Sequence, residues 1–311
     1  MAPRLGINHL QMLTAVVETG SVAEAAELLG VTPSALSHRI REAERRLDVQ
    51  LFTRLGRRLR LTPAGELLHQ AAARLLDELE QVETVAQKMA YGIEHVVRLG
   101  IATYSSYHWL PAFLAHLYDL APEIEVEVVA NAVHRPIAAL HEGDIDLAIV
   151  PDVLKPPGAP SETLFEDELV AIMAPEHRLA AKRFVEAADF RELDVLTYSL
   201  TNLPGHEFDL FWRPAGVTPR RIIRVELVDA IVDLVKANLG LAIVQRWAIA
   251  PHLDAGTLAA SRLTATGIRV GWSVIRRATA EDETAPARVA AALAAWSAHN
   301  GFAGKIPSAH A

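Results

Sequence analysis

Residues 21–62 constrain the fold of this chain more than any other stretch. Ser21 and Thr32 each stand where a helix N-cap is expected, and Pro33 follows at a first helical position, where its missing N–H costs nothing. Gly30 lies between the two predicted helices, at the position of a tight turn. The second helix is predicted to run to Leu47, with a buried face of Leu36, Ile40, Ala43 and Leu47. This pattern is typical of a helix-turn-helix.

The polar face of the second predicted helix carries the side chains that we expect to meet DNA. A recognition helix reads base edges with its N-terminal part, so Ser34, Ser37 and His38 are the predicted base contacts. Arg39 and Arg41 can reach either bases or the phosphate backbone. For Ser37, local capping or packing is the alternative.

A short basic stretch follows and is predicted to form a wing. Arg54, Arg57 and Arg58 flank Gly56, with Arg60 close behind. Arginines clustered beside a recognition helix favour phosphate binding. The alternative is a solvated, salt-bridged surface, which is the usual state of charged runs.

The charge is divided unevenly along the chain. The whole chain has a net charge of −8, but residues 1–65 hold nine arginines, no lysine and six acidic residues, which gives +3 and leaves −11 for the rest. A basic N-terminal part on an acidic body is compatible with nucleic-acid binding despite the acidic total.

A long helix is predicted after Thr62-Pro63. Its apolar residues recur at alternating spacings of four and three, as in a heptad seam: Leu68, Ala72, Leu75, Leu79, Val82, Ala86 and Met89. An amphipathic surface helix is the alternative. The seam is long and follows a predicted DNA-binding domain, which favours a dimer that presents two recognition helices to two half-sites.

Composition excludes several classes of site and protein. There is no cysteine among the 311 residues, so disulfides, zinc-thiolate sites and thiol nucleophiles are excluded. The thirteen histidines show no metal-ligand spacing, and no cofactor or hydrolase motif is present, so we expect neither a metal nor a cofactor nor an enzyme. No signal peptide or membrane-length apolar run is visible, and we expect a cytoplasmic protein without a membrane segment.

From Val96 onward the pattern alternates between strands and helices. The predicted strands are 96–101, 124–129, 145–150, 169–173, 195–198, 222–225, 241–244 and 270–275, with helices at 109–120, 136–142 and 229–238. Such alternation implies parallel sheets covered by helices, here in two sets of about four strands. Small ligands bind beyond the C-terminal ends of the strands in folds of this kind.

Those strand ends supply the candidate effector-binding residues. Hydroxyl groups and free N–H groups at a helix start can bind a carboxylate, which singles out the run Thr103, Tyr104, Ser105 and Ser106. Ordinary capping by the two serines is the alternative. Other strand ends contribute His134, Tyr198, Thr201 and Glu226, of which Glu226 could pair with an ammonium group. Asp229 is expected to act as an N-cap rather than as a ligand.

The chain resembles the LysR-type transcriptional regulators over nearly its whole length. The most specific stretch is SALSHRIREAERRLDVQLFTRLGRRLRLTPAG, residues 34–65. The resemblance implies an all-α winged helix-turn-helix (1–62), a dimerising linker helix (63–91) and an α/β effector domain like a periplasmic binding protein (92–300), followed by a disordered tail (301–311). The effector domain would have two subdomains, the first from about 96–163 and 277–300 and the second from about 164–276.

Within that family, four segments are similar to the subgroup that regulates methionine biosynthesis: TYSSYHWLP, RPIAALHEGDIDLAIV, WRPAGVTP and VELVDAIVDLVKANLGLAIVQRWAIAPHL. The similarity implies a homocysteine-like co-inducer. The chain departs from the family where Ala43-Glu44 replaces a Leu-Glu pair and Asp48 replaces a glycine, and from the subgroup at Tyr104-Ser105-Ser106. We expect local packing to adapt at Ala43 and Asp48.

The sequence thus predicts a ligand-responsive transcription factor that binds an interrupted inverted repeat in double-stranded DNA. The resemblance implies a homodimer that assembles to a homotetramer and can contact RNA polymerase. A LysR-type regulator of another pathway is the first alternative, and a cytoplasmic solute-sensing module without DNA function is the second.

Overall fold

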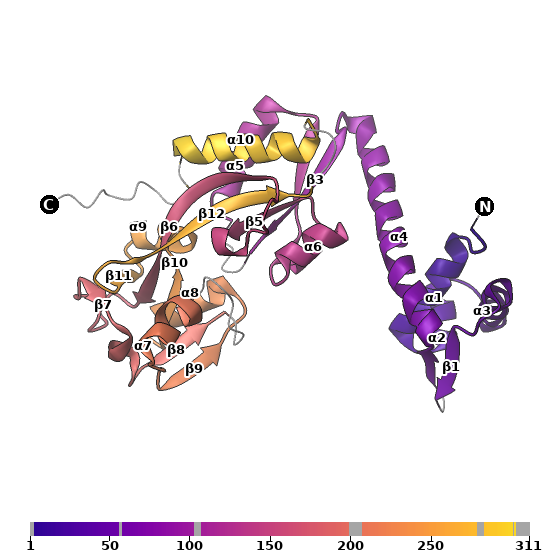
Figure 1. Cartoon of the computed structure of the whole chain (residues 1–311), viewed down its shortest axis with the longest axis horizontal. Helices are drawn as coiled ribbons and strands as arrows, with labels where there is room; N and C mark the ends of the chain where they lie inside the picture. The colour runs from indigo at the N-terminus through magenta and orange to yellow at the C-terminus, as the bar shows by residue number, and fades with distance from the viewer. Residues whose placement is uncertain are drawn as a thin grey trace. The chain divides into compact units, whose positions relative to one another are not determined.

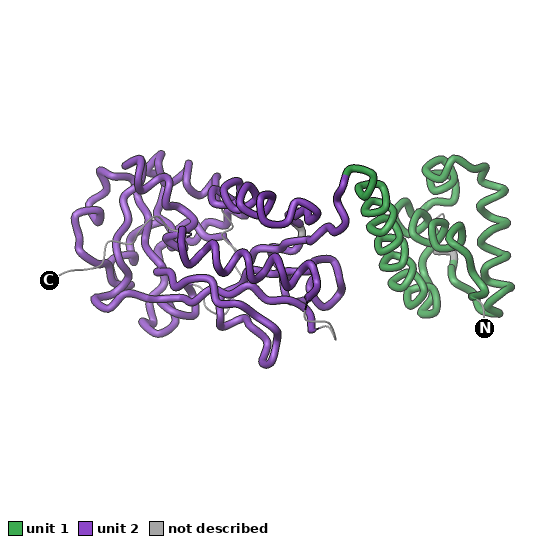
Figure 2. The backbone as a smooth tube through the Cα atoms, turned by 90° about the horizontal axis from the view of Figure 1, so that it is seen from above, with its two compact units in different colours: residues 1–91 green, residues 92–311 purple. Residues whose placement is uncertain are grey.

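The computed structural model describes residues 3–55, 58–102, 107–198, 207–278, 283–300 and 302, and only the backbone of residues 54, 55, 58 and 131. The chain divides into two compact units, residues 1–91 and 92–311 (Figure 2).

Unit 1 is a small helical domain with a two-stranded hairpin. Its elements are α1 (Ile7–Thr19), α2 (Val22–Leu28), α3 (Pro33–Leu47), β1 (Phe52–Leu55), β2 (Arg58–Leu61) and α4 (Pro63–Lys88) (Figure 1). The predicted caps are confirmed: the Ser21 side chain accepts from Glu24 N, and that of Thr32 from Ala35 N. Leu36, Ile40 and Ala43 are buried against α1 and α2.

The end of α3 shows how the chain accommodates Asp48. This residue has φ 58° and ψ 36°, the left-handed conformation in which glycine is least strained. Its N–H bonds to the carbonyl of Glu44 and so closes the helix. Aspartate tolerates this conformation better than most side chains do, so the turn survives the departure from glycine.

The hairpin is fixed to the start of α4 by short contacts. The Thr62 hydroxyl donates to Gln50 O at 2.7 Å, and Thr62 N donates to Leu51 O at 2.9 Å. A Cβ on Gly65 would lie 2.1 Å from that same carbonyl oxygen, so only glycine allows α4 to approach the hairpin this closely. The base of the hairpin and the long helix therefore form one packed structure.

Unit 2 contains a mixed sheet in the order β4-β3-β5-β12-β6-β10-β8-β9, to which β11 and β7 are added. The strands are β3 (His95–Ile101), β4 (Ile124–Val128), β5 (Leu147–Pro151), β6 (Ser161–Met173), β7 (Phe184–Val185), β8 (Asp194–Thr197), β9 (Arg221–Arg224), β10 (Leu241–Gln245), β11 (Ala259–Leu263) and β12 (Ile268–Arg276). The main helices are α5 (Leu110–Leu120), α6 (Pro136–Glu142), α8 (Val228–Lys236), α9 (Ala250–Asp254) and α10 (Ala285–Asn300).

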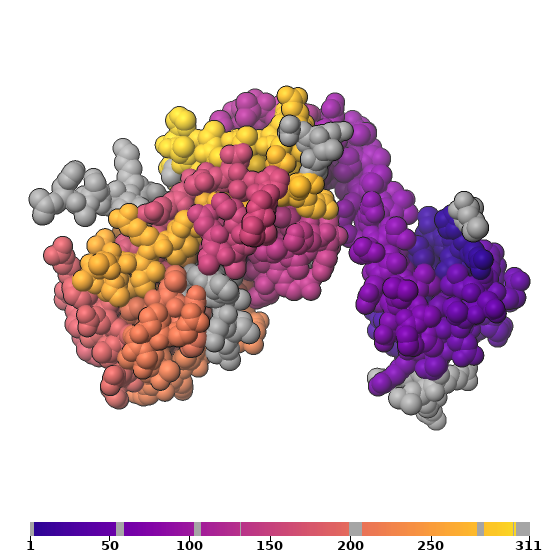
Figure 3. Space-filling model, viewed as in Figure 1, coloured from indigo at the N-terminus to yellow at the C-terminus, as the bar shows by residue number. Residues whose placement is uncertain are grey.

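These elements form two lobes. The first lobe holds the parallel strands β3, β4 and β5 with α5, α6 and α10, and the second holds the parallel strands β8, β9 and β10 with α8 (Figure 1). In the space-filling view the first lobe carries the yellow and magenta surface and the second the orange surface (Figure 3).

The two lobes share one continuous sheet, whereas the sequence suggested two separate sets of strands. The long strands β6 and β12 run antiparallel to each other from one lobe to the other, with an irregularity at Trp272/Ser273. Only the second half of β6 was predicted, because half of the residues in its first half, SETLFEDE, are acidic. Asp229 does not cap α8 as expected: the helix starts at Val228, its N-cap is Leu227, and Asp229 lies in the first turn.

Candidate nucleic-acid interface and effector cavity

Helix α3 presents a polar face away from the core of unit 1. Ser34, His38 and Arg41 are exposed, and Ser37 and Arg39 are half-buried beside them. Ser34 shares a hydrogen bond of 3.0 Å with the Thr32 hydroxyl. Among the described residues neither Arg39 nor Arg41 forms an ion pair, which leaves both guanidinium groups available to an outside anion. The face has the composition that base and phosphate contacts require.

Arg46, one turn further along the helix, is engaged within the fold. Its guanidinium pairs with Glu42 and donates to the carbonyl of Arg4 at 3.0 Å. The hydrogen bond from Arg46 lowers the pKa of Glu42 below its ordinary value, with a smaller contribution from His9. Arg46 thus stabilises the fold, whereas Arg39 and Arg41 form no ion pair among the described residues.

Three of the predicted DNA contacts belong to the wing. Arg54 and Arg58 lie on the paired strands β1 and β2, where Leu55 is opposite Arg58, but their side chains are not described. Arg57 lies outside the described residues. Arg60 on β2 is exposed and opposite Thr53. The hairpin itself is therefore confirmed, and its contacts with DNA stay a prediction.

The apolar residues of α4 divide into two sets. Leu68 and Ala72 pack into the core of unit 1, so the first part of the predicted seam stabilises the domain itself. Leu75 and Val82 on α4, and Met89 directly after its last residue, are 53%, 61% and 56% exposed and lie at heptad spacing. We call these three residues the α4 stripe. A row of large apolar side chains facing water is typical of a surface that another chain covers.

Unit 2 contains a cavity of about 760 Å³ at the C-terminal ends of its parallel strands. The segments after β3 and β4 contribute Tyr107, His108, Ala130, Val133 and His134 from the first lobe. The segments after β8, β9 and β10 contribute Tyr198, Glu226, Leu227, Val228, Asp229, Ala230, Val232, Ala248, Pro251 and His252 from the second. Its volume suits a small organic molecule, and its position is the one at which open α/β sheets bind ligands.

Aromatic and acidic side chains dominate the polar part of this cavity. The His134 ring is stacked on Tyr198, with centroids 5.4 Å apart and planes at 28°. Burial raises the pKa of the Tyr198 hydroxyl, and Tyr107 nearby adds to the increase. Burial lowers the pKa of His252, an effect that Asp229 opposes. Glu226 and Asp229 supply the carboxylates that line the second-lobe wall of the cavity.

The structure brings together some of the predicted effector-binding residues. His134, Tyr198 and Glu226 all line the cavity, although Glu226 is exposed and pairs with Arg224. Thr103, Tyr104, Ser105, Ser106 and Thr201 lie outside the described residues. Sequence reasoning missed Ala248, Pro251 and His252, which follow β10. Their position directly after a strand end was the available signal.

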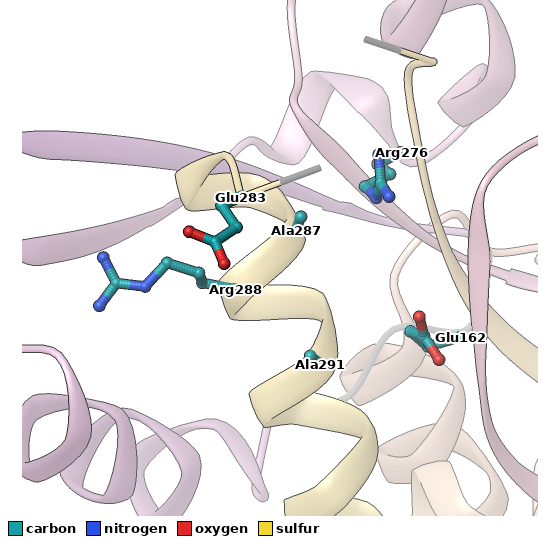
Figure 4. A pocket seen from close by; sticks show the side chains of 6 residues that line it. All are labelled: Glu162, Arg276, Glu283, Ala287, Arg288 and Ala291. Carbon is teal, nitrogen blue, oxygen red and sulfur yellow. The ribbon is translucent and has the colours of Figure 1, made fainter. Parts of the chain in front are cut away.

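A second, smaller hollow of about 440 Å³ lies where α10 starts (Figure 4). It is lined by Glu162, Arg276, Glu283, Ala287, Arg288 and Ala291. Arg288 extends away from Glu162 and Arg276 and pairs with Glu123 at 2.6 Å (Figure 4). A backbone hydrogen bond lowers the pKa of Glu123 most, and the hydrogen bond from Arg288 lowers it further. Arg276 pairs with Leu147, the first residue of β5, so the hollow lies away from the C-terminal strand ends and is a weaker ligand site than the cavity.

Two protein-family models match the chain. One, described as bacterial regulatory helix-turn-helix protein, lysR family, matches residues 7–66, and the other, described as LysR substrate binding domain, matches residues 92–298. The chain belongs to the LysR family. It is a DNA-binding transcriptional regulator, and the helix-turn-helix of unit 1 is its family's DNA-binding module.

Among the relatives of this LysR-family regulator are proteins named HTH-type transcriptional regulator MetR. The protein of Escherichia coli is 30% identical over 243 residues, which cover 78% of this chain and 75% of the relative. That of Haemophilus influenzae is 30% identical over 285 residues, which cover 90% of each chain.

Solved structures agree with this fold. The regulatory domain of MetR from N. meningitidis aligns with a TM-score of 0.54 and 26% identity, over 65% of this chain and 93% of that domain. Full-length CbnR in complex with its target DNA aligns with a TM-score of 0.69 over 94% of this chain and 100% of that one. At 21% identity the second likeness concerns the fold alone.

In the described part of the chain, no helix combines the length and hydropathy needed to cross a bilayer. No group of three or more histidine or acidic side chains gathers there in a way that could hold a metal ion.

Proposed function

We propose that this regulator senses a small amino acid related to homocysteine and controls genes of sulfur amino-acid metabolism. The observation that carries the proposal is the similarity to MetR proteins along both units, at 30% identity over as much as 90% of the chain. The cavity adds physical support, because its volume suits a small molecule, and Glu226 and Asp229 line its second-lobe wall.

The proposal assigns a role to each part of the chain. Residues 1–62 bind DNA, residues 63–91 dimerise through the α4 stripe, and residues 92–300 bind the effector in the cavity. A two-fold dimer would bind an interrupted inverted repeat, and two dimers would form a tetramer. The protein acts in the cytoplasm, as a regulator rather than an enzyme, and can contact RNA polymerase from its DNA site.

Effector binding would act by changing the relative stability of two arrangements of the lobes. A ligand shifts such an equilibrium only as far as its affinities for the two states differ. The cavity takes residues from both lobes, and among the described strands β6 and β12 run continuously between them. A ligand that contacts both lobes can therefore favour one arrangement of the lobes. That change would in turn alter the affinity of the dimer for DNA.

The test uses the purified full chain in two assays. Thermal unfolding is followed with L-homocysteine, L-methionine, other L-amino acids and organic acids, because a ligand of the native state raises its apparent stability. Binding to duplex DNA is then measured with and without each stabilising compound. The proposal predicts that L-homocysteine gives a dose-dependent shift and alters DNA affinity. A shift with organic acids alone would instead favour a LysR-type regulator of another pathway.

A further inference from the structure

A phenylalanine that follows helix α10 is buried among aromatic rings from several parts of unit 2. Phe302 is 2% exposed. Four ring centroids lie close to that of Phe302: Trp109 and Phe165 at 4.5 Å, Trp296 at 5.7 Å and Trp247 at 5.9 Å. Aromatic pairs at such distances stabilise a fold beyond the area that they bury. The position of Phe302 is therefore well determined by its surroundings.

The backbone of the same residue contacts the wall of the effector cavity. Nε2 of His108 lies 3.2 Å from the carbonyl oxygen of Phe302. A carbonyl oxygen can only accept a hydrogen bond, so this nitrogen carries the hydrogen and donates. His108 is exposed and lines the cavity from the first lobe, whereas Phe302 is not a lining residue. Phe302 thus lies directly behind a side chain that an effector can reach.

The ring of Phe302 packs where the two long strands are irregular. Phe165 on β6 is opposite Trp272 on β12, and their rings are stacked with planes at 11°. The register shift between these strands lies between Trp272 and Ser273. Phe302 is stacked on Phe165, with planes at 25°. Because a packed interior transmits a displacement, one residue connects the cavity wall with the strands that join the lobes.

Ordinary burial of an aromatic ring after a helix is the alternative to a functional role. It accounts for the ring contacts of Phe302. A buried ring does not by itself require a hydrogen bond from its backbone carbonyl to an exposed histidine of the cavity. The two interpretations differ in what the effector should sense when the ring of Phe302 is changed.

We propose that Phe302 is a positioning residue of the effector cavity. Its carbonyl orients the imidazole of His108 toward the effector, and its ring connects that contact with β6 and β12. The inference rests on the proposed function, since it takes the cavity as the effector site. Energetic coupling between Phe302 and His108 is the evidence that such a connection requires.

The first test needs no effector. The full chain is treated with diethyl pyrocarbonate, which modifies accessible imidazole nitrogens, and modification of His108 is followed by peptide mass mapping. Phe302→Leu removes the ring that anchors the carbonyl. We expect His108 to be modified about 2- to 10-fold faster in this variant, the factor that corresponds to one hydrogen bond.

Phe190→Leu is the matched control for this test. Phe190 is 0% exposed, and its ring packs against Phe211 and Trp212, neither of which lines the cavity. Leucine keeps an apolar side chain at both positions, so both variants are expected to fold. An unchanged rate in Phe302→Leu, or an equal increase in Phe190→Leu, would show that Phe302 does not hold His108.

The second test measures L-homocysteine binding by calorimetric titration of the full chain. We expect Phe302→Leu to weaken binding by about 3- to 10-fold, and Phe190→Leu to leave it unchanged. His108→Ala should weaken binding too, and adding Phe302→Leu to it should then have little further effect, since Phe302 acts through His108. An equal loss from Phe302→Leu in both backgrounds would mean that its role is structural only. Normal binding by His108→Ala would also overturn the inference.

The two tests separate this inference from the proposed function. If the wild type binds no L-amino acid, the proposed effector class is wrong, and the rate of His108 modification still decides whether Phe302 holds that ring. If the wild type binds L-homocysteine, and Phe302→Leu matches it in both affinity and rate of modification, the inference is wrong and the effector class stands.

Discussion

The carboxylate of Glu44 accepts a hydrogen bond of 2.9 Å from the backbone N–H of Leu51. The same oxygen lies 3.3 Å from the backbone nitrogen of Phe52, the first residue of β1. One side chain of the recognition helix therefore holds the start of the wing. The orientation of the wing relative to α3 depends on this contact.

Replacement of Glu44 tests that dependence. Glu44→Ala leaves two N–H groups without an acceptor, and we expect it to lower the free energy of unfolding of unit 1 by about 1–3 kcal/mol. Glu44→Gln keeps an oxygen acceptor and should lose less. Urea unfolding followed by circular dichroism measures both, and equal losses in the two variants would show that the hydrogen bonds are not the cause.

Arg41 is exposed on α3 and forms no ion pair within the described residues, so we expect it to neutralise a phosphate. Arg41→Ala should reduce the slope of log K against log salt for duplex DNA by about 1. Arg74→Ala on α4 makes the same change in charge away from the recognition helix and is the control. Fluorescence anisotropy over a salt series gives both slopes, and identical slopes would remove Arg41 from the interface.

The α4 stripe is expected to form the dimer contact. The double variant Leu75→Glu with Val82→Glu places charges in an apolar interface and should yield monomers. Leu67→Glu changes a residue that is 73% exposed but lies off the stripe, so it should leave assembly intact. Sedimentation equilibrium measures the masses. A dimer that persists in the double variant would locate the contact elsewhere.

Asp167 predicts a pH dependence of stability. Burial raises its pKa from 3.8 to about 7, against the opposing effect of its backbone hydrogen bonds. Between those two values the folded protein holds a proton that the unfolded chain has lost, so stability falls as pH rises and levels off above about 7.

Asp167→Asn keeps a neutral side chain at every pH and should remove this contribution. Relative to the wild type, the variant should gain roughly 1 kcal/mol for each pH unit across that window. Urea unfolding of both proteins at a series of pH values gives the difference. Two parallel profiles would mean that Asp167 does not titrate in this range.

The sequence predicted the local structure of unit 1 well because the signals there are local. The caps at Ser21 and Thr32 fix the helix starts, and α3 ends at Leu47 as predicted. The role of Glu44 was not predicted, because its partners Leu51 and Phe52 are backbone groups brought near by the turn. The packing of Leu68 and Ala72 into the core of unit 1 was also not predicted. A heptad pattern does not distinguish packing against the same domain from packing against another chain.

In unit 2 the sequence showed where the strands end, but it did not show which strand ends lie close together. His134, Tyr198 and Glu226 were identified because each follows an apolar strand. His252 carries no motif, and the order of the strands brings it to the cavity with residues of the other lobe. The continuity of β6 and β12 was likewise invisible, because charged residues interrupt the apolar pattern of β6.

The most direct test of the central claim is selection of randomised duplex DNA by the full chain. The account predicts enrichment of an interrupted inverted repeat, with half-sites separated by about 10 base pairs or a multiple of that spacing. His38→Ala should relax the preference within each half-site. Recovery of unrelated sequences, or of a single half-site without symmetry, would contradict a dimeric regulator that reads DNA through α3.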